Sequence, residues 1–157
     1  MPPDGPRTDD RQSGKRAIGQ GSFLGSNFQG MALWQEAQEL AERVARAVTS
    51  LPKDTAAQSI GSQLVRAAGS VPANIAEGYG RFSQAAYRNH LSIARGSAFE
   101  AQSWLDLLVR LGFLEKRDGA RLLGLCSEVQ RKLSVRMKEL ERQVDRRIRE
   151  QGGAYEV

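Results

Sequence analysis

Two clusters of polar residues occur where the sequence is otherwise apolar. Asn74 and Glu77 lie next to the apolar positions of one predicted helix, with Arg66 earlier in the same stretch, and Arg95 and Glu100 lie in the middle of the next predicted helix. Polar groups near a buried helix face cost free energy unless they are paired. We therefore expect the two clusters to meet as one structural polar network. If Glu77 belongs to a buried charged pair there, its removal costs on the order of 3–5 kcal/mol.

The same carboxylates admit a weaker alternative, an enzyme that uses Glu77 or Glu100 in catalysis. Ferritin-like bundles bind metals through Glu-x-x-His motifs, but Gly80 and Ser103 stand where those histidines would be. His90 is the only histidine, and no carboxylate lies three or four positions from it. We therefore predict no catalytic residue, no metal site and no cofactor, and interpret both glutamates as structural partners.

Hydrophobic periodicity predicts four helices, at about residues 32–50, 55–79 and 84–111, and from a start between residues 115 and 119 to about residue 148. The chain has 157 residues, of which 40% are hydrophobic and 6% aromatic, and its many Ala, Leu, Arg and Glu residues favour a single all-α domain. Because the predicted links are short, the leading topology is an antiparallel up-down-up-down four-helix bundle over residues 31–150.

The second predicted helix contains residues that disfavour helical structure. Gly69, Ser70 and Pro72 follow one another closely in it. Proline lacks a backbone N–H and pushes the preceding residue out of the α region. We expect this helix to be interrupted and bent near Pro72, with Ser70 capping its second half.

The third predicted helix carries two apolar faces. The first is a seam with alternating steps of three and four residues, as in bundle cores: Leu91, Ala94, Ala98, Ala101, Leu105 and Leu108. The second face points elsewhere, and apolar surface of this kind is normally covered on so small a bundle. It predicts contact with other copies of the chain, so that the bundle assembles as a ring-like homo-oligomer. The predicted oligomer interface consists of Trp34, Tyr87, Trp104 and Leu107.

The fourth predicted helix combines an apolar stripe with a basic edge. The stripe is Leu122, Cys126, Val129, Leu133, Met137, Leu140, Val144 and Ile148, which predicts that the single cysteine is buried. Between residues 129 and 149 there are eight basic and three acidic residues. Helical spacing puts five of the basic residues on one edge: Arg131, Lys138, Arg142, Arg146 and Arg149.

This basic edge has two interpretations, a solvated face with balanced charge or a surface that contacts phosphates. The net charge of +5 permits an acidic partner without identifying one. Few aromatic residues can be placed at the surface from the sequence, which favours phosphate contact over base stacking. We therefore predict that RNA or DNA is bound without sequence being read.

The ends of the chain differ from its centre. Residues 1–30 are rich in Gly, Ser, Pro, Gln and Asp, which predicts a disordered leader, either native or an added segment, and residues 151–157 are predicted to fray. No apolar run approaches the roughly 20 residues that span a membrane. The N-terminus also lacks the apolar segment of a signal peptide. We expect a cytoplasmic protein without a membrane partner.

Residues 66–81, R-A-A-G-S-V-P-A-N-I-A-E-G-Y-G-R, are followed by L-S-I-A-R-G-S-x-x-E at 91–100 and by L-x-x-L-G-F-L at 108–114. Together with L-W-Q-E-A-Q-E-L-A at 33–41, these motifs resemble the four-helix-bundle family of 23S rRNA intervening-sequence proteins. That family includes the accessory variability determinant of diversity-generating retroelements. The resemblance implies an antiparallel four-helix protomer in a ring-like pentamer. For the retroelement members it also implies binding to nucleic acid and to a reverse transcriptase.

Two main hypotheses follow. The first is a non-enzymatic, oligomeric nucleic-acid-binding accessory protein, which serves a reverse transcriptase if the chain is a retroelement member rather than a stand-alone one. The second is a protein-interaction scaffold that binds no nucleic acid. If the basic edge of the fourth helix is not the binding surface, Arg81, Arg88 and the leader are the next candidates.

Overall fold

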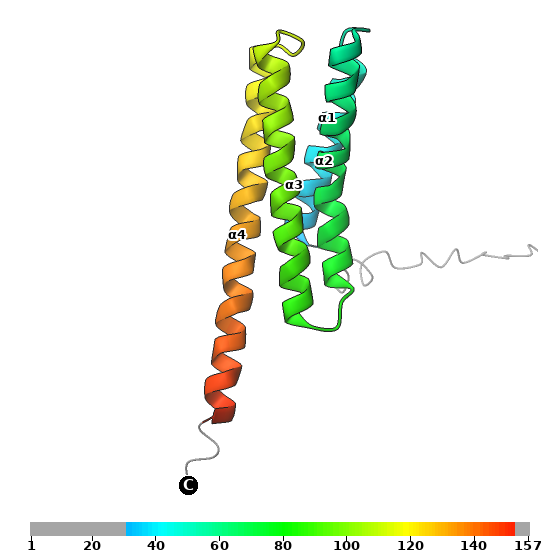
Figure 1. Cartoon of the computed structure of the whole chain (residues 1–157). Coiled ribbons are helices and arrows are strands. Elements are labelled where there is room, and N and C mark those ends of the chain that lie inside the picture. The colour runs from blue at the N-terminus through cyan, green and yellow to red at the C-terminus, as the bar shows by residue number, and fades with distance from the viewer. Residues whose placement is uncertain (1–30, 153–157) are drawn as a thin grey trace, which may run out of the picture.

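The computed structural model describes residues 31–152, which form four α-helices joined by short links (Figure 1). The helices are α1 (Ala32–Thr49), α2 (Thr55–Tyr79), α3 (Gln84–Arg110) and α4 (Lys116–Gly152). No strand occurs among the described residues, so the predicted all-α class is confirmed. The predicted leader, residues 1–30, lies outside the described residues, as do residues 153–157. Residues 151 and 152, predicted to fray, continue α4.

The helices are arranged as a four-helix bundle. The links that follow α1 and α3 lie at one end of the bundle, and the link between α2 and α3 lies at the other end (Figure 1). Both α1 and α3 pack against α2 and α4, while no close backbone approach joins the diagonal pairs of these described helices. Each helix therefore occupies one corner and turns one face toward a common core.

The core consists of the aliphatic stripes that the sequence predicts. The largest aliphatic side chains that are fully buried come from all four helices: Leu40, Val44, Leu64, Val71, Ile75, Leu91, Leu105, Leu108, Val129 and Leu133. Burial of one such side chain stabilises the folded state by about 1.5–3 kcal/mol. The predicted seam of α3 is inside as well, with Ala94, Ala98 and Ala101 completely buried. Small residues at that level leave room for a neighbouring helix to approach closely.

Gly78 marks a close approach between α2 and α3. A Cβ added there would lie 2.7 Å from the Cβ of His90 and 2.9 Å from Cδ2 of Tyr87. The backbone oxygen of Tyr87 would be 3.3 Å away. A side chain at this position therefore requires the two helices to move apart near the α2–α3 link.

The predicted interruption of α2 does not occur. The helix runs without a break from Thr55 to Tyr79 and carries Pro72 in its interior. Ser70 is helical rather than a cap, and its backbone oxygen accepts a hydrogen bond of 2.8 Å from Asn74 Nδ2. Pro72 is buried in the bundle, although proline has no backbone N–H to donate within the helix. The predicted bend near Pro72 stays a prediction.

Local capping residues define several of the helix boundaries. The side chain of Asp54 accepts hydrogen bonds from the backbone nitrogens of Ala56 at 2.8 Å and Ala57 at 3.1 Å, which begins α2. Ser83 accepts one from Ala86 at 3.1 Å and begins α3. Gly112 has a φ of +73°, the left-handed conformation that commonly ends a helix at glycine.

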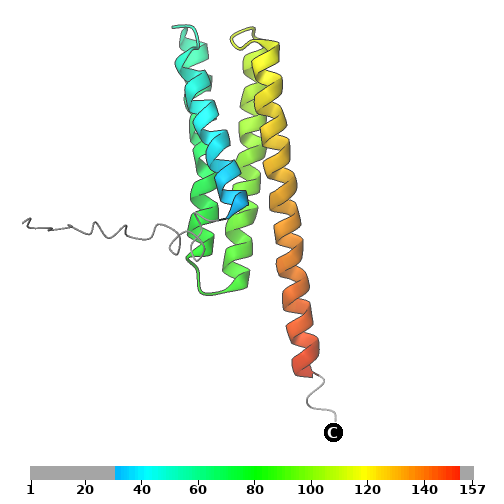
Figure 2. The ribbon, with the colours of Figure 1, turned by 180° about the vertical axis from the view of Figure 1, so that it is seen from behind.

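The last third of α4 projects beyond the rest of the bundle (Figures 1 and 2). Every described side chain from residue 141 to residue 151 is exposed. The predicted apolar stripe of α4 is buried only as far as Leu140, and its last two members, Val144 and Ile148, are exposed. We call residues 141–152 the α4 extension.

Two residues with ionisable side chains are packed in the core. Cys126 is fully buried, as predicted, and burial raises the pKa of its thiol to about 11. Tyr87 is only 8% exposed, so it belongs to the core rather than to the outer face of α3 on which it was predicted. Burial raises the pKa of Tyr87, and the guanidinium of Arg136 near its ring opposes part of that rise.

The contact at Gly78 predicts that Gly78→Ala lowers the melting temperature. Forcing extra volume into a packed site typically costs about 1–3 kcal/mol, while alanine in place of glycine in a helix gains at most about 1 kcal/mol. Gly124→Ala in α4 is the matched control, because beyond the neighbouring backbone of α4 itself no atom lies within 4 Å of the added Cβ there. Thermal unfolding at one fixed protein concentration measures both variants, and equal melting temperatures would contradict the close approach.

Candidate functional site

A chain of polar side chains crosses the interface between α2 and α3. The hydroxyls of Ser70 and Ser97 share a hydrogen bond of 3.0 Å. Asn74 Nδ2 lies 3.0 Å from Ser70 Oγ, and Asn74 Oδ1 lies 3.4 Å from His90 Nδ1. The other ring nitrogen of His90 is 3.8 Å from a carboxylate oxygen of Glu77. Asn74 and Glu77 are thus connected through His90, and Ser70 connects the chain to Ser97 of α3, but the predicted contact of Asn74 and Glu77 with Arg95 and Glu100 does not form.

Glu77 differs from the expectation in its burial. Its side chain is 52% exposed and forms an ion pair with Arg81 one turn later, which is itself 50% exposed. Exposed pairs of this kind contribute between zero and about 1 kcal/mol, because water already solvates both charges. The expectation of a buried charged pair at Glu77 is therefore wrong.

The other predicted members of the network lie elsewhere within the protomer. The Arg95 guanidinium lies over the ring of Phe99, 5.3 Å from its centroid. Glu100 accepts a hydrogen bond of 3.3 Å from Trp104 Nε1. Arg66 and Glu100 line one small pocket of about 150 Å³ between α2 and α3. The three residues share the surface of these helices without joining Asn74 and Glu77.

The polar side chains between α2 and α3 form a structural contact and show no arrangement suited to catalysis or metal binding. His90 faces one amide and one carboxylate, and the hydroxyl of Ser97 also lies 3.0 Å from the carbonyl oxygen of Ile93. Between residues 31 and 152, no three His, Cys, Asp or Glu side chains gather closely enough to hold a metal ion. The polar atoms that are buried here satisfy one another across α2 and α3, as bundle interfaces require.

The predicted basic edge of α4 is exposed along its whole length. Arg131 is already paired there, with its Nη2 2.7 Å from an Oε1 of Glu128, and this hydrogen bond lowers the pKa of Glu128. Four further side chains form no ion pair with another described residue: Lys138, Arg142, Arg146 and Arg149. No carboxylate of the described chain contacts these four charges, which face solvent. The charge of Arg131, in contrast, is paired with Glu128.

A cleft beside this edge contains two further basic residues, Arg88 and Arg95. The sequence assigned Arg95 to the polar network and left Arg88 only as an alternative binding residue. Arg88 and Arg95 of α3 and Lys138 of α4 line a hollow of about 280 Å³, together with Ser134, Met137 and Glu141. Arg88 is paired with Glu141, and Arg95 makes its contact with Phe99. The seven-residue spacing of Arg88 and Arg95, two helical turns, was the available sequence signal. We call this hollow the α3–α4 cleft.

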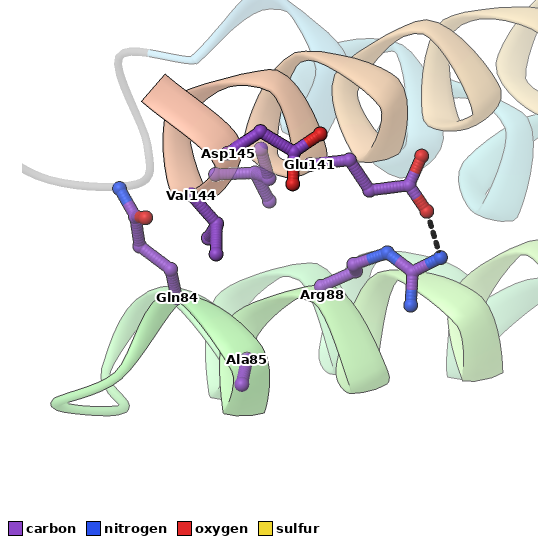
Figure 3. Close-up of a pocket in the computed structure, with 7 residues that line it drawn as sticks. Gln84, Ala85, Arg88, Glu141, Val144 and Asp145 are labelled. Atoms are coloured by element: carbon purple, nitrogen blue, oxygen red, sulfur yellow. Dashed lines mark hydrogen bonds and ion pairs between the residues drawn. The ribbon is translucent and has the colours of Figure 1, made fainter. Parts of the chain in front are cut away.

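A second hollow lies next to it, where α3 begins and the α4 extension starts (Figure 3). It measures about 300 Å³ and is lined by Gln84, Ala85, Arg88, Leu140, Glu141, Val144 and Asp145. The ion pair between Arg88 and Glu141 crosses it, and Asp145 adds a second carboxylate (Figure 3). This mixture of acidic and apolar groups does not suit a phosphate.

Aromatic rings are more exposed than the sequence suggested. Phe82 in the α2–α3 link is fully exposed, and 47% of Phe99 on α3 is exposed. Tyr79 is 43% exposed and meets the ring of Tyr87 edge-on, with 6.4 Å between the centroids. The expectation of few exposed aromatic residues is wrong, because neither Phe82 nor Phe99 belongs to the core.

The predicted oligomer interface keeps three of its four residues near the surface. Trp34, Trp104 and Leu107 are partly buried, whereas Tyr87 lies inside the protomer. On α3 the apolar set continues with the exposed residues Ile93 and Leu111, which follow the same helical spacing. An apolar face therefore does lie on α3, on the side away from the α3–α4 cleft.

Fold and surface together define an all-α four-helix bundle with a basic outer edge, and none of its described helices is both long and apolar enough to cross a membrane. Residues 29–135 match the model of the 23S rRNA-intervening sequence protein family, and the chain belongs to that family. The Lys138, Arg142, Arg146 and Arg149 part of the basic edge lies after the matched region.

A solved structure supports the assignment. It is the crystal structure of a protein of unknown function from the S23 ribosomal protein family of Bacteroides thetaiotaomicron, with 25% sequence identity and a TM-score of 0.64. The similarity covers 68% of this chain and 98% of that one. No protein with curated annotation matches the chain.

The polar chain between α2 and α3 predicts unequal effects for its members. Asn74→Ala removes the side chain that bridges Ser70 and His90, and loss of a partly buried hydrogen-bonding group costs about 1–3 kcal/mol. Glu77→Ala removes an exposed pair and costs less than about 1 kcal/mol. Urea denaturation at a fixed protein concentration measures both, and a larger loss for Glu77→Ala would contradict this ranking.

Proposed function

We propose that this protein is a non-enzymatic, oligomeric accessory protein that binds nucleic acid through its phosphates. The observation that most directly supports this proposal is a row of exposed basic side chains on α4, from Lys138 to Arg149. These side chains make no ion pair with other described residues. Binding of phosphates releases counterions from the nucleic acid, so cations that are free of carboxylates contribute most. A nucleic-acid partner also fits the cytoplasmic location that we propose.

Assembly multiplies this surface. We propose that the protomer is an antiparallel bundle, which the positions of the three links support, and that five protomers form a ring. Trp34, Trp104 and Leu107 would lie in the contacts between protomers. With +5 per chain, such a ring carries about +25 in total.

Structured RNA is the first ligand to test, because the name of the family refers to 23S rRNA. A reverse transcriptase is the proposed protein partner if the chain serves a diversity-generating retroelement. The second candidate function, a scaffold for another protein without nucleic acid, is favoured by the apolar residues that stay exposed at one end. These are Phe82, Val144 and Ile148.

The proposal predicts that Lys138→Glu with Arg142→Glu weakens binding to every sequence alike. Each lost phosphate contact lowers the slope of log K against log salt by about 0.9 for a duplex. Fluorescence anisotropy with a structured RNA and a random duplex, across a salt series, measures affinity and slope together. A folded double variant that binds as tightly as the wild type would exclude this edge as the binding surface.

The matched control reverses two charges at the other end of the bundle. Lys53→Glu with Lys116→Glu makes the same change in net charge, and both residues are exposed and without an ion pair in the described chain. We expect this control to bind nearly as tightly as the wild type. An equal loss in both double variants would mean that total charge, not the α4 edge, governs binding. No binding by the wild type at low salt would favour the scaffold.

The proposed assembly predicts a solution mass of about five times the chain mass of 17.3 kDa. The apolar residues on the outer face of α3 provide the driving force, since their burial against another copy removes them from water. Light scattering at micromolar concentration measures the mass. Leu107→Glu places a charge in the proposed contact and should dissociate the ring, whereas a monomeric wild type would refute the assembly.

A further inference from the structure

Phe99 and Arg95 form an exposed, positively charged stacking surface on α3. Nearly half of the Phe99 side chain is exposed, and its ring takes no part in the hydrophobic core. The guanidinium of Arg95, one turn earlier, lies 5.3 Å from the centroid of that ring, within the range of a cation–π contact. Arg95 forms no ion pair with any residue from 31 to 152, so its charge stays available to a ligand.

Two contacts between α3 and α4 fix where this surface lies along the bundle. Gln130 Nε2 donates a hydrogen bond of 2.7 Å to Gln102 Oε1, and Arg88 pairs with Glu141. Residues between 88 and 102 of α3 therefore face residues between 141 and 130 of α4. That part of α4 contains Lys138, which lines the α3–α4 cleft together with Arg95.

Phosphate-binding cations and a stacking surface thus lie side by side. Lys138 belongs both to the cleft and to the basic edge of α4, so the edge continues across the cleft to Arg95 and Phe99. The cleft holds three cations and one carboxylate, and that carboxylate, Glu141, is occupied by Arg88. A duplex offers only its phosphates to such a surface, because its bases are stacked inside. A single strand offers phosphates and base faces at once.

We propose that the ligand is single-stranded nucleic acid, with a base stacked on the Arg95–Phe99 surface and the adjoining phosphates on Lys138 and Arg142. This inference rests on the proposed function and narrows it from phosphates in general to unpaired strands. The stacking chemistry is shared by RNA and DNA, since every base has a π-face. The two are separated by testing strands of the same sequence.

The test compares wild type, Phe99→Leu and Phe99→Trp by fluorescence anisotropy. The probes are single-stranded RNA and DNA of about 20 nucleotides, longer than most single-strand sites, and the corresponding DNA duplex. Phe99→Leu keeps an apolar side chain but loses the aromatic face, so single-strand affinity should fall about tenfold. Duplex affinity should change less than about twofold, because phosphate contacts remain. Phe99→Trp should restore single-strand binding.

Phe82→Leu is the control, since Phe82 is another exposed phenylalanine and lies on the link at the end of the bundle, away from Arg95. It should leave single-strand binding unchanged. If the wild type binds the duplex as tightly as the strands and Phe99→Leu has no effect, the inference fails while phosphate binding stands. If the wild type binds none of the probes, the proposed function fails as well. A change in oligomeric mass for Phe99→Leu, measured by light scattering, would instead place Phe99 in a subunit contact and overturn the inference.

Discussion

The close packing of α2 against α3 is the constraint on which the rest of the structure depends. Gly78 leaves no space for a side chain between the helices, and the completely buried Ala94 and Ala98 continue the small surface along α3. At this separation short polar side chains reach each other, which is why the hydroxyls of Ser70 and Ser97 meet directly. Groups that are costly to bury alone are satisfied because the two backbones are near.

This packing determines which side chains remain for the surface. Since the inward face of α3 carries mainly small residues and leucines, with Tyr87 among them, its exposed larger side chains lie on two outer edges. One edge adjoins α4 and carries Arg88, Arg95 and Phe99. The other is apolar and carries Ile93 and Leu111. In the proposed ring the second edge would be covered by a neighbouring copy, which leaves the first for nucleic acid.

The family match covers only the first part of α4. The family match ends at residue 135, within the region where α4 packs on the bundle. The α4 extension and most of the basic edge follow it. Arg95 and Phe99 lie inside the matched region, so the proposed site joins a stacking surface on the shared bundle to cations that this chain carries beyond it.

The sequence by itself determined the class of fold and the approximate extent of the four helices, although α4 runs further than expected. Apolar spacing placed the four helices, because the pattern of buried and exposed positions acts within one or two turns of chain. The motifs in residues 66–81 and 91–100 also pointed to the right family. The sequence predicted a break at Pro72 because proline disfavours the interior of a helix. The helix continues there nonetheless, since α2 packs along its length against α3 and α1.

Only the tertiary structure decided which side chains are buried and which ones meet. Periodicity assigns a residue to a face but does not say what stands opposite. Tyr87 therefore proved to be core and Glu77 exposed, and Val144 and Ile148, predicted to belong to the buried stripe of α4, are exposed as well. The pairing of Asn74 with His90, and the alignment of Arg95 and Phe99 with Lys138, depend on the register between helices. That register is set by contacts between residues distant in sequence, such as Gln102 with Gln130 and Arg88 with Glu141, which no local pattern encodes.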